Sequence, residues 1–268
     1  PVLDPWEDAS PADGKRLFRA LCAGCHGADG AGDGISARTM FPPPRDLTAG
    51  VYKFRSTSSG TLPTRDDLLR TLTDGLPGTE MPSWGPQLKD EQLRSLVLFV
   101  ERLSPRFKAE PRRAQDVLVD AANLSAPAPT PEVLARGEQV YADMKCATCH
   151  GELGRGDGDA ASQYGRKNGS NTEVFDFTWG VYKGGASAES LYRTFVTGLD
   201  GTPMPSYVDS LPDDADRWAL ASYVLSLTRK RGLPFYLSER PTWYEPSAPR
   251  SKRTDKRPSA NTEGVLGP

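Results

Sequence analysis

Two short segments hold every cysteine and every histidine of this 268-residue chain. Residues 21–26 read Leu-Cys-Ala-Gly-Cys-His, and residues 145–150 read Lys-Cys-Ala-Thr-Cys-His. Each segment pairs two thiols at a C-x-x-C spacing with a histidine directly after the second thiol. The six residues are Cys22, Cys25, His26, Cys146, Cys149 and His150. A chain that concentrates these side chains in two matching units is expected to build two matching sites.

The C-x-x-C-H spacing favours covalent attachment of haem. It places two thiols about one helical turn apart, where they can form thioethers with the two vinyl groups of one haem, and the next histidine can face the iron. A zinc site needs four ligands, whereas each segment offers three, and the pooled six are too many for one ion and too few for two. A disulfide or a redox dithiol does not require the histidine. The sequence therefore predicts two c-type haems, attached at Cys22 with Cys25 and at Cys146 with Cys149.

The chain also repeats itself outside these segments. Residues 68–72 match 191–195, and residues 78–84 match 201–207, both at an offset of 123. The C-x-x-C-H motifs match at an offset of 124, and residues 47–53 match 177–183 at an offset of 130. Loop-length changes between retained motifs are typical of two homologous domains with the same fold.

The repeat indicates a second ligand for each iron. Met81 and Met204 lie 55 and 54 residues after the two histidines, each in a Gly-Thr-x-Met-Pro-Ser-aromatic segment. A methionine often serves only to fill a core, but two at matched positions in matched loops favour ligation of iron through the thioether sulfur. Met40 has no counterpart in the second copy, and Met144 lies on the attachment side, so packing roles are expected for both.

Start and stop signals predict three helices in each copy. Ser10-Pro11 and Thr130-Pro131 are an N-cap followed by proline at the first helical position. The first helix of each copy is predicted to begin at Pro11 or Pro131, and the second to run from about 64 to 75 or from 188 to 197. The last helix of each copy is predicted from apolar residues three and four positions apart in 93–103 and 218–227.

This order of helix, C-x-x-C-H, glycine-rich loop, helix, Met-Pro loop and terminal helix resembles the class I cytochrome c family. Two copies in one chain resemble the tandem dihaem cytochromes c, and the match covers roughly residues 10–104 and 131–230. The resemblance implies a mainly α fold of two tandem class I cytochrome c-like domains with long loops, each wrapped around one covalent haem. The implied ligand sets are Cys22, Cys25, His26 and Met81, and Cys146, Cys149, His150 and Met204.

The haem surroundings are expected to differ between the copies. In many members of this family a proline carbonyl after the motif orients the histidine, and Pro42, Pro43 or Pro44 could supply it in the first copy. The second copy has no proline between His150 and Pro203, so another group must fix that ring.

Several basic and aromatic residues are candidates for the surroundings of the haem carboxylates. Arg45 and Arg55 are candidate partners by charge, in the first copy only. The Tyr-Lys pairs at 52–53 and 182–183 could donate to the same groups, although a packing role is equally open. The loop from Phe54 to Pro63 has no counterpart in the second copy.

We expect four parts along the chain. These are a first cytochrome c domain at 1–104, a proline-rich linker at 105–130, a second cytochrome c domain at 131–237, and a polar tail at 238–268. The linker ends in the stiff, extended stretch 126–131. The tail is rich in Pro, Ser, Lys and Arg, so we expect it to be extended and, alone, disordered.

Composition limits the classes of function. The net charge is −2 and no basic stripe carries interleaved aromatics, so a nucleic-acid partner is not expected. The longest apolar run, 96–100, is far short of the roughly 20 residues that span a bilayer. No charged and apolar leader opens the chain, so we expect the numbering to start at a mature or trimmed terminus.

The ligand set favours electron transfer over catalysis. A haem with His and Met ligands has no vacant iron position, and methionine favours ferrous iron. We therefore expect a dihaem carrier of single electrons, either a shuttle or the cytochrome subunit of a respiratory oxidoreductase, on the periplasmic or outward-facing side of a bacterial membrane. Its partners would be redox proteins, including a larger membrane or periplasmic oxidoreductase complex, with no transmembrane segment in this chain. The alternative is a peroxidase-like dihaem enzyme in which a methionine dissociates.

Overall fold

A computed structural model describes residues 4, 6–110, 113–120, 123–164 and 172–229. The predicted tail at 238–268 lies outside the described residues, as does the end of the second predicted domain after Arg229. Within the described ranges the regular structure is helical, apart from one isolated antiparallel bridge between Thr57 and Val117. The prediction of a mainly α fold is confirmed.

The first copy of the repeat, residues 10–104, is built around two helices at its ends. The longest are α1 (Pro11–Leu21) and α4 (Asp90–Leu103), which pack against each other, with α3 (Arg65–Asp74) against α4. Two short helices, α2 (Ala23–His26) and the 3-10 helix η1 (Ile35–Thr39), lie between α1 and α3. The core gathers apolar residues of these helices, with Phe18, Leu93, Leu96 and Val97 at most 2% exposed.

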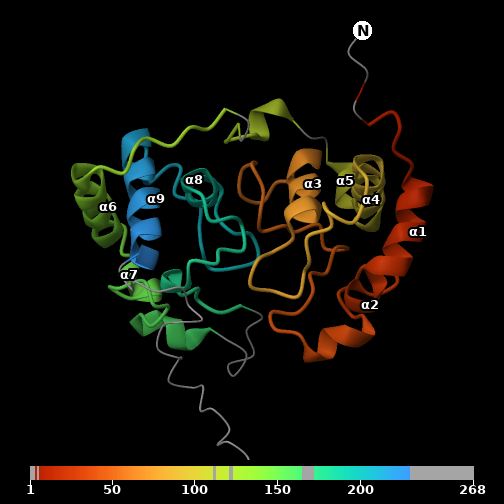
Figure 1. Cartoon of the computed structure of the whole chain (residues 1–268), viewed down its shortest axis with the longest axis horizontal. Helices are drawn as coiled ribbons and strands as arrows, with labels where there is room; N and C mark the ends of the chain where they lie inside the picture. The colour runs from red at the N-terminus through yellow and green to blue at the C-terminus, as the bar shows by residue number, and fades with distance from the viewer. Residues whose placement is uncertain (1–3, 5, 111–112, 121–122, 165–171, 230–268) are drawn as a thin grey trace, which may run out of the picture. The chain divides into compact units, whose positions relative to one another are not determined.

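The second copy, residues 131–230, repeats this arrangement. Helix α6 (Pro131–Asp143) lies beside α9 (Asp214–Arg229), and α8 (Ala188–Thr197) packs on α9 (Figure 1). The short helices are α7 (Ala147–His150), η3 (Asp159–Gln163) and η5 (Phe177–Trp179). Met144 packs at the margin of this core, as predicted.

The predicted helix boundaries are confirmed by their caps. The Ser10 and Thr130 side chains accept hydrogen bonds from the third helical residue of α1 and α6, each with proline in the first turn. Thr64 forms the predicted capping box with Asp67, and α3 ends at Gly75. Helix α8 runs over the predicted residues 188–197 and ends at Gly198.

A glycine lets the first and last helix of each copy cross in backbone contact. A Cβ added at Gly14 would lie 2.0 Å from the carbonyl oxygen of Ser95 in α4. A Cβ added at Gly137 would lie 2.1 Å from the carbonyl oxygen of Ala219 in α9. This close approach brings the C-terminal helix of each copy against the helix that leads into the C-x-x-C-H motif.

One inserted residue explains why the offset between the copies changes from 123 to 124. Gly14 and Gly137 are 123 apart, whereas Cys22 and Cys146 are 124 apart. Between them, Lys145 adopts a left-handed backbone conformation with φ of 55°. The extra residue is therefore absorbed as a tight turn before Cys146, and the motif keeps its geometry.

Residues 105–130 pack along both copies. Helix α5 (Arg106–Ala109) and the 3-10 helix η2 (Ala114–Asp116) open this stretch. The carbonyl of Ser56 in the first copy accepts hydrogen bonds from the backbone N–H groups of Leu118 and Val119, while the Val119 side chain is buried in the second core. Further on, the Ala126 N–H donates to Glu189 of α8.

In the described part of the chain, no helix has both the length and the hydropathy needed to cross a bilayer.

Candidate functional site

The C-x-x-C-H motif adopts the same short helix in both copies. In the first copy Cys22 caps the end of α1, and the chain continues as α2 up to His26. In the second copy Cys146 and His150 take the equivalent places around α7. Gly27 and Gly151 end these helices with φ of 79° and 75°, a conformation that glycine adopts without strain.

None of the four cysteines is in a disulfide. Burial, with a smaller effect of nearby Cys25, raises the pKa of Cys22 to about 11. Burial likewise raises the pKa of Cys146 to about 11, against the opposing effect of its own backbone N–H. Because thiolates are the form that binds metal ions, these raised pKa values disfavour direct ligation of a metal by Cys22 and Cys146.

Each histidine ring is oriented by a main-chain carbonyl. The Nδ1–H of His26 donates to the carbonyl oxygen of Arg45 at 3.1 Å, and that of His150 donates to the carbonyl oxygen of Phe175 at 3.2 Å. The expected acceptor in the first copy, a carbonyl of Pro42, Pro43 or Pro44, is therefore wrong. In the second copy the unnamed group that fixes the ring is the Phe175 carbonyl.

This hydrogen bond suits a neutral imidazole that binds iron through Nε2. Burial lowers the pKa of His26 and His150 below the usual value for histidine, and the carbonyl hydrogen bond opposes that shift in each case. A ring that donates from Nδ1 keeps the lone pair of Nε2 for a metal.

Matching backbone hydrogen bonds hold the two carbonyls in place. The N–H of Leu47, two residues after Arg45, donates to the Gly30 carbonyl at 2.7 Å. The N–H of Phe177, two residues after Phe175, donates to the Gly154 carbonyl at the same distance. The loop after each motif is thus fastened at one equivalent point, although the second loop is six residues longer.

The two predicted methionine ligands lie in identical turns. In the first copy the Leu76 N–H donates to the Met81 carbonyl at 3.0 Å, and the Met81 N–H donates to Thr79 Oγ1 at 3.1 Å. In the second copy the Leu199 N–H donates to the Met204 carbonyl at 3.0 Å. The Met204 N–H donates to Thr202 Oγ1 at 3.2 Å.

Both methionine side chains are half-buried and pack at the margin of the core that also contacts the motif of the same copy. Met81 lies against the core that contains Cys22, and Met204 lies against the core that contacts Cys146. Each copy thus offers two thiols, an oriented imidazole and a thioether around one core. This donor set fits a covalent haem c.

The surroundings of the two histidines differ in aromatic character. The ring of Phe177 stacks on His150, with centroids 4.3 Å apart and planes 20° apart. Leu47 takes the matching place in the first copy. The sequence alignment placed Phe177 opposite Leu47 without indicating that this residue contacts the histidine.

Basic side chains of both copies come together at their interface. Burial, together with the positive charges of Arg45 and Lys183, lowers the pKa of Lys53 to about 8. Burial also lowers the pKa of Lys183. A half-buried group of cations favours an anionic partner, and the carboxylates of haem are anions of the required kind.

Arg55, the other candidate partner for a haem carboxylate, has a different role. Its side chain is 0% exposed and forms an ion pair with Asp200 of the second copy at 2.8 Å. The expectation based on charge alone is wrong, because the guanidinium is already occupied by protein acceptors.

The interface between the copies also follows the repeat. Gly78, in the Met81 turn, faces Val181 of the second copy, since a Cβ added there would lie 3.5 Å from a methyl group of that valine. Gly201, in the Met204 turn, faces Val51 of the first copy at the same distance, and it also lies against Arg45, whose Nη1 would be 3.1 Å from an added Cβ. Each methionine turn therefore packs on the Val-Tyr-Lys segment of the other copy.

The fold and these paired donor sets define a protein with two class I cytochrome c domains. Two family models match the chain: cytochrome C oxidase, cbb3-type, subunit III, over residues 9–100, and cytochrome c, over residues 134–228. The chain belongs to the cytochrome c family, carries two of its domains in tandem, and has two covalently bound c-type haems.

Known proteins with both domains are similar over most of the chain. The Cbb3-type cytochrome c oxidase subunit CcoP of Azospirillum sp. (strain B510) is 30% identical over 221 residues, which cover 81% of this chain and 62% of that protein. The subunit FixP of Sinorhizobium medicae (strain WSM419) is 28% identical, covering 80% of this chain and 59% of that protein. The chain thus spans less than two thirds of the length of these relatives.

A solved structure matches the chain more completely. A chain of the Kuenenia stuttgartiensis reducing HAO-like protein complex is 41% identical and superposes with a TM-score of 0.74. The match covers 82% of this chain and 97% of that chain.

Proposed function

We propose that this chain relays single electrons between redox proteins through two six-coordinate haems. In the first copy, Cys22 and Cys25 attach the haem, and His26 and Met81 are the axial ligands. In the second copy the equivalent residues are Cys146, Cys149, His150 and Met204. The observation that carries the proposal is the duplication of the whole arrangement: a histidine held by a carbonyl and a methionine held in a closed turn.

This ligand set supports transfer of electrons over chemistry at the iron. When bound, a haem supplies a one-electron couple whose potential depends on its ligands and surroundings. The protein keeps the imidazole neutral and oriented through its carbonyl partner, and the Met-Pro turn presents a thioether. With both axial positions filled, no site remains for peroxide or another substrate.

The interface supports a relay between the two copies. Each methionine turn packs on the Val-Tyr-Lys segment of the other copy, so both ligand loops lie at the boundary that an electron would cross. The cationic group of Arg45, Lys53 and Lys183 at the same boundary would receive haem carboxylates.

The relatives support a role as the cytochrome subunit of a larger oxidoreductase rather than as a free shuttle. CcoP and FixP are named as oxidase subunits, and the solved relative belongs to a protein complex. We propose the periplasmic or outward-facing side of a bacterial membrane as the location, because c-type haem is attached outside the cytoplasm.

The ligand assignment is tested by the far-red absorption of the ferric protein, where charge transfer from methionine to iron appears. Two equivalents per chain are expected, with one lost in Met81→Ala and the other in Met204→Ala, while Met144→Leu keeps both. Fewer than two equivalents in the unmodified protein would mean an open or replaced ligand. Peroxide turnover at that haem would then support the enzymatic alternative.

A further inference from the structure

The loop from Phe54 to Pro63 binds the second copy through one buried arginine, Arg55. The guanidinium of Arg55 donates to two carbonyls of its own copy, those of Tyr52 at 3.2 Å and Ser58 at 3.3 Å. It also donates to the carbonyl of Thr197 at 2.7 Å and to Asp200 Oδ1 at 2.8 Å, both in the second copy. A fully buried arginine with four acceptors, two in each copy, fixes the two copies to each other.

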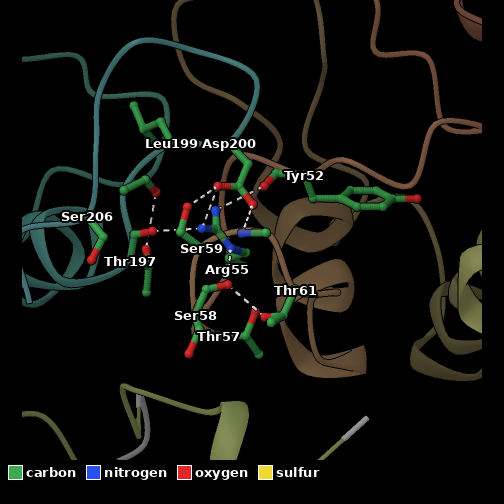
Figure 2. Close-up of polar contacts among 12 residues, drawn as sticks. Tyr52, Arg55, Thr57, Ser58, Ser59, Thr61, Thr197, Leu199, Asp200 and Ser206 are labelled. Atoms are coloured by element: carbon green, nitrogen blue, oxygen red, sulfur yellow. Dashed lines mark hydrogen bonds and ion pairs between the residues drawn. The ribbon is translucent and has the colours of Figure 1, made fainter. Parts of the chain in front are cut away.

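Asp200 is held by the same loop at both of its carboxylate oxygens. Besides Arg55, Ser59 Oγ donates to Oδ1 at 2.7 Å, and the Gly60 N–H donates to Oδ2 at 2.8 Å (Figure 2). The Asp200 side chain is only 13% exposed. Removing one partner of such a buried pair leaves the other charge without compensation, which is the costly way to break it.

The loop itself is held by hydrogen bonds to Arg106 and Asp116, in the segment that follows the first copy. The guanidinium of Arg106 donates to the Gly60 carbonyl at 2.8 Å and to the Gly50 carbonyl at 2.7 Å. The Ser58 N–H donates to the Asp116 carbonyl at 2.8 Å. Asp200 is therefore bound to a fixed support and not to a free loop.

Asp200 lies inside the turn that carries Met204. The backbone hydrogen bond from Leu199 N–H to the Met204 carbonyl closes this turn around Asp200, and Thr202 N–H donates to the Leu199 carbonyl at 3.0 Å. A restraint on Asp200 is thereby a restraint on the backbone that positions Met204.

Within the described ranges, the first copy has no such restraint. Pro77 stands where the second copy has Asp200, and the second copy has no loop equivalent to 54–63 that could reach back. The Met81 turn is closed by the same internal hydrogen bonds, but among the described residues no charged group of the other copy forms a hydrogen bond or an ion pair with it.

We infer that the 54–63 loop clamps the ligand turn of the second haem, so that Arg55 and Asp200 are positioning residues for Met204. This inference rests on the proposed function, in which Met204 binds iron. The first copy thus sets how readily the second iron exchanges its ligand, while the Met81 turn is independent of the clamp.

The test is the rate at which cyanide replaces methionine in the ferric holoprotein. Loss of methionine limits this reaction, so each haem gives one phase, and Met81→Ala and Met204→Ala identify the phases. Asp200→Asn should speed the Met204 phase about tenfold, equivalent to about 1.4 kcal/mol, and leave the Met81 phase within about twofold. Ser59→Ala, a milder change at an exposed residue, should speed the same phase by a smaller factor.

The matched control is Asp216→Asn, which breaks a two-point ion pair elsewhere in the second copy. The Asp216 side chain is 14% exposed, much like Asp200, but its partner Arg136 is 53% exposed, whereas Arg55 is fully buried. This substitution should leave both phases unchanged. The inference is overturned if Asp200→Asn behaves like this control, or if it speeds both phases equally, since that would be a general loosening. If Met204→Ala changes neither the far-red band nor the cyanide phases, the ligand assignment itself fails, and the inference fails with it.

Discussion

Replacing Gly14 by alanine should destabilise the first copy because the new methyl group has no space at the helix crossing. Its Cβ would lie 2.0 Å from the Ser95 carbonyl oxygen and 2.9 Å from the Phe99 Cβ, whereas ordinary contacts begin near 3.4 Å. The oxygen belongs to the backbone, so α1 and α4 must separate. Overpacking costs roughly 1–3 kcal/mol, and alanine regains about 1 kcal/mol of helix propensity. Taking the upper end for a backbone clash gives a net loss of about 2 kcal/mol.

For a domain of about 100 residues this loss lowers the melting temperature by roughly 8–16 °C. The measurement is thermal unfolding of the holoprotein followed by circular dichroism and by haem absorption. Gly24→Ala is the control, because a Cβ there meets nothing within 4 Å and Thr148 occupies the matching position in the second copy. A Gly14→Ala protein that melts at or above the temperature of the unmodified protein would refute the packing argument.

Three further changes test single side chains of the two copies. Tyr141→Phe removes a 2.7 Å hydrogen bond to the buried Gly151 carbonyl and should lower the free energy of unfolding in urea by about 1 kcal/mol. Phenylalanine is a suitable replacement because Phe18 holds the matching place in the first copy. Lys145→Gly relieves a left-handed residue and should raise the unfolding free energy by up to about 1 kcal/mol, whereas Lys145→Ala should not. Burial and the nearby cations Arg45 and Lys183 lower the Lys53 pKa to about 8, and a haem carboxylate beside the lysine would raise that pKa again. One haem potential should therefore fall as pH rises above about 8 and this cation is lost, and Lys53→Met should abolish that slope.

Each of these expectations has a clear contrary result. An unchanged urea midpoint in Tyr141→Phe would mean that water replaces the hydroxyl group. A gain from Lys145→Ala equal to that from Lys145→Gly would attribute the effect to side-chain charge instead of backbone conformation. A potentiometric titration with the same slope in Lys53→Met would assign the slope to another group.

The sequence predicted the features that depend on neighbouring residues. The caps at Ser10, Thr64 and Thr130 could be identified because each is a local pattern of three or four residues. The two copies could be aligned because each motif is short and retained. The caps are confirmed in the structure, and the paired segments take matching places in it.

The sequence did not predict contacts that depend on how long loops close. The carbonyl partner of His26 lies 19 residues further along the chain and that of His150 lies 25 further, and any residue in those loops offers a carbonyl. The role of Arg55 was also missed, because charge alone does not show that an arginine will be buried against Asp200, 145 residues away. The loop at 54–63, which has no counterpart in the second copy, was the sequence signal for a contact that only the first copy makes.

Orientation of the histidines by main-chain atoms has a consequence for how duplicated sites diverge. A carbonyl is present whatever the side chain, so positions 45 and 175 can change identity without loss of the ring orientation. The first copy has a cation there and the second an aromatic ring, on the same backbone hydrogen bond. After duplication, each site could therefore acquire its own electrostatic environment by ordinary substitution, and a pair of initially equal centres could become a graded path with a preferred direction.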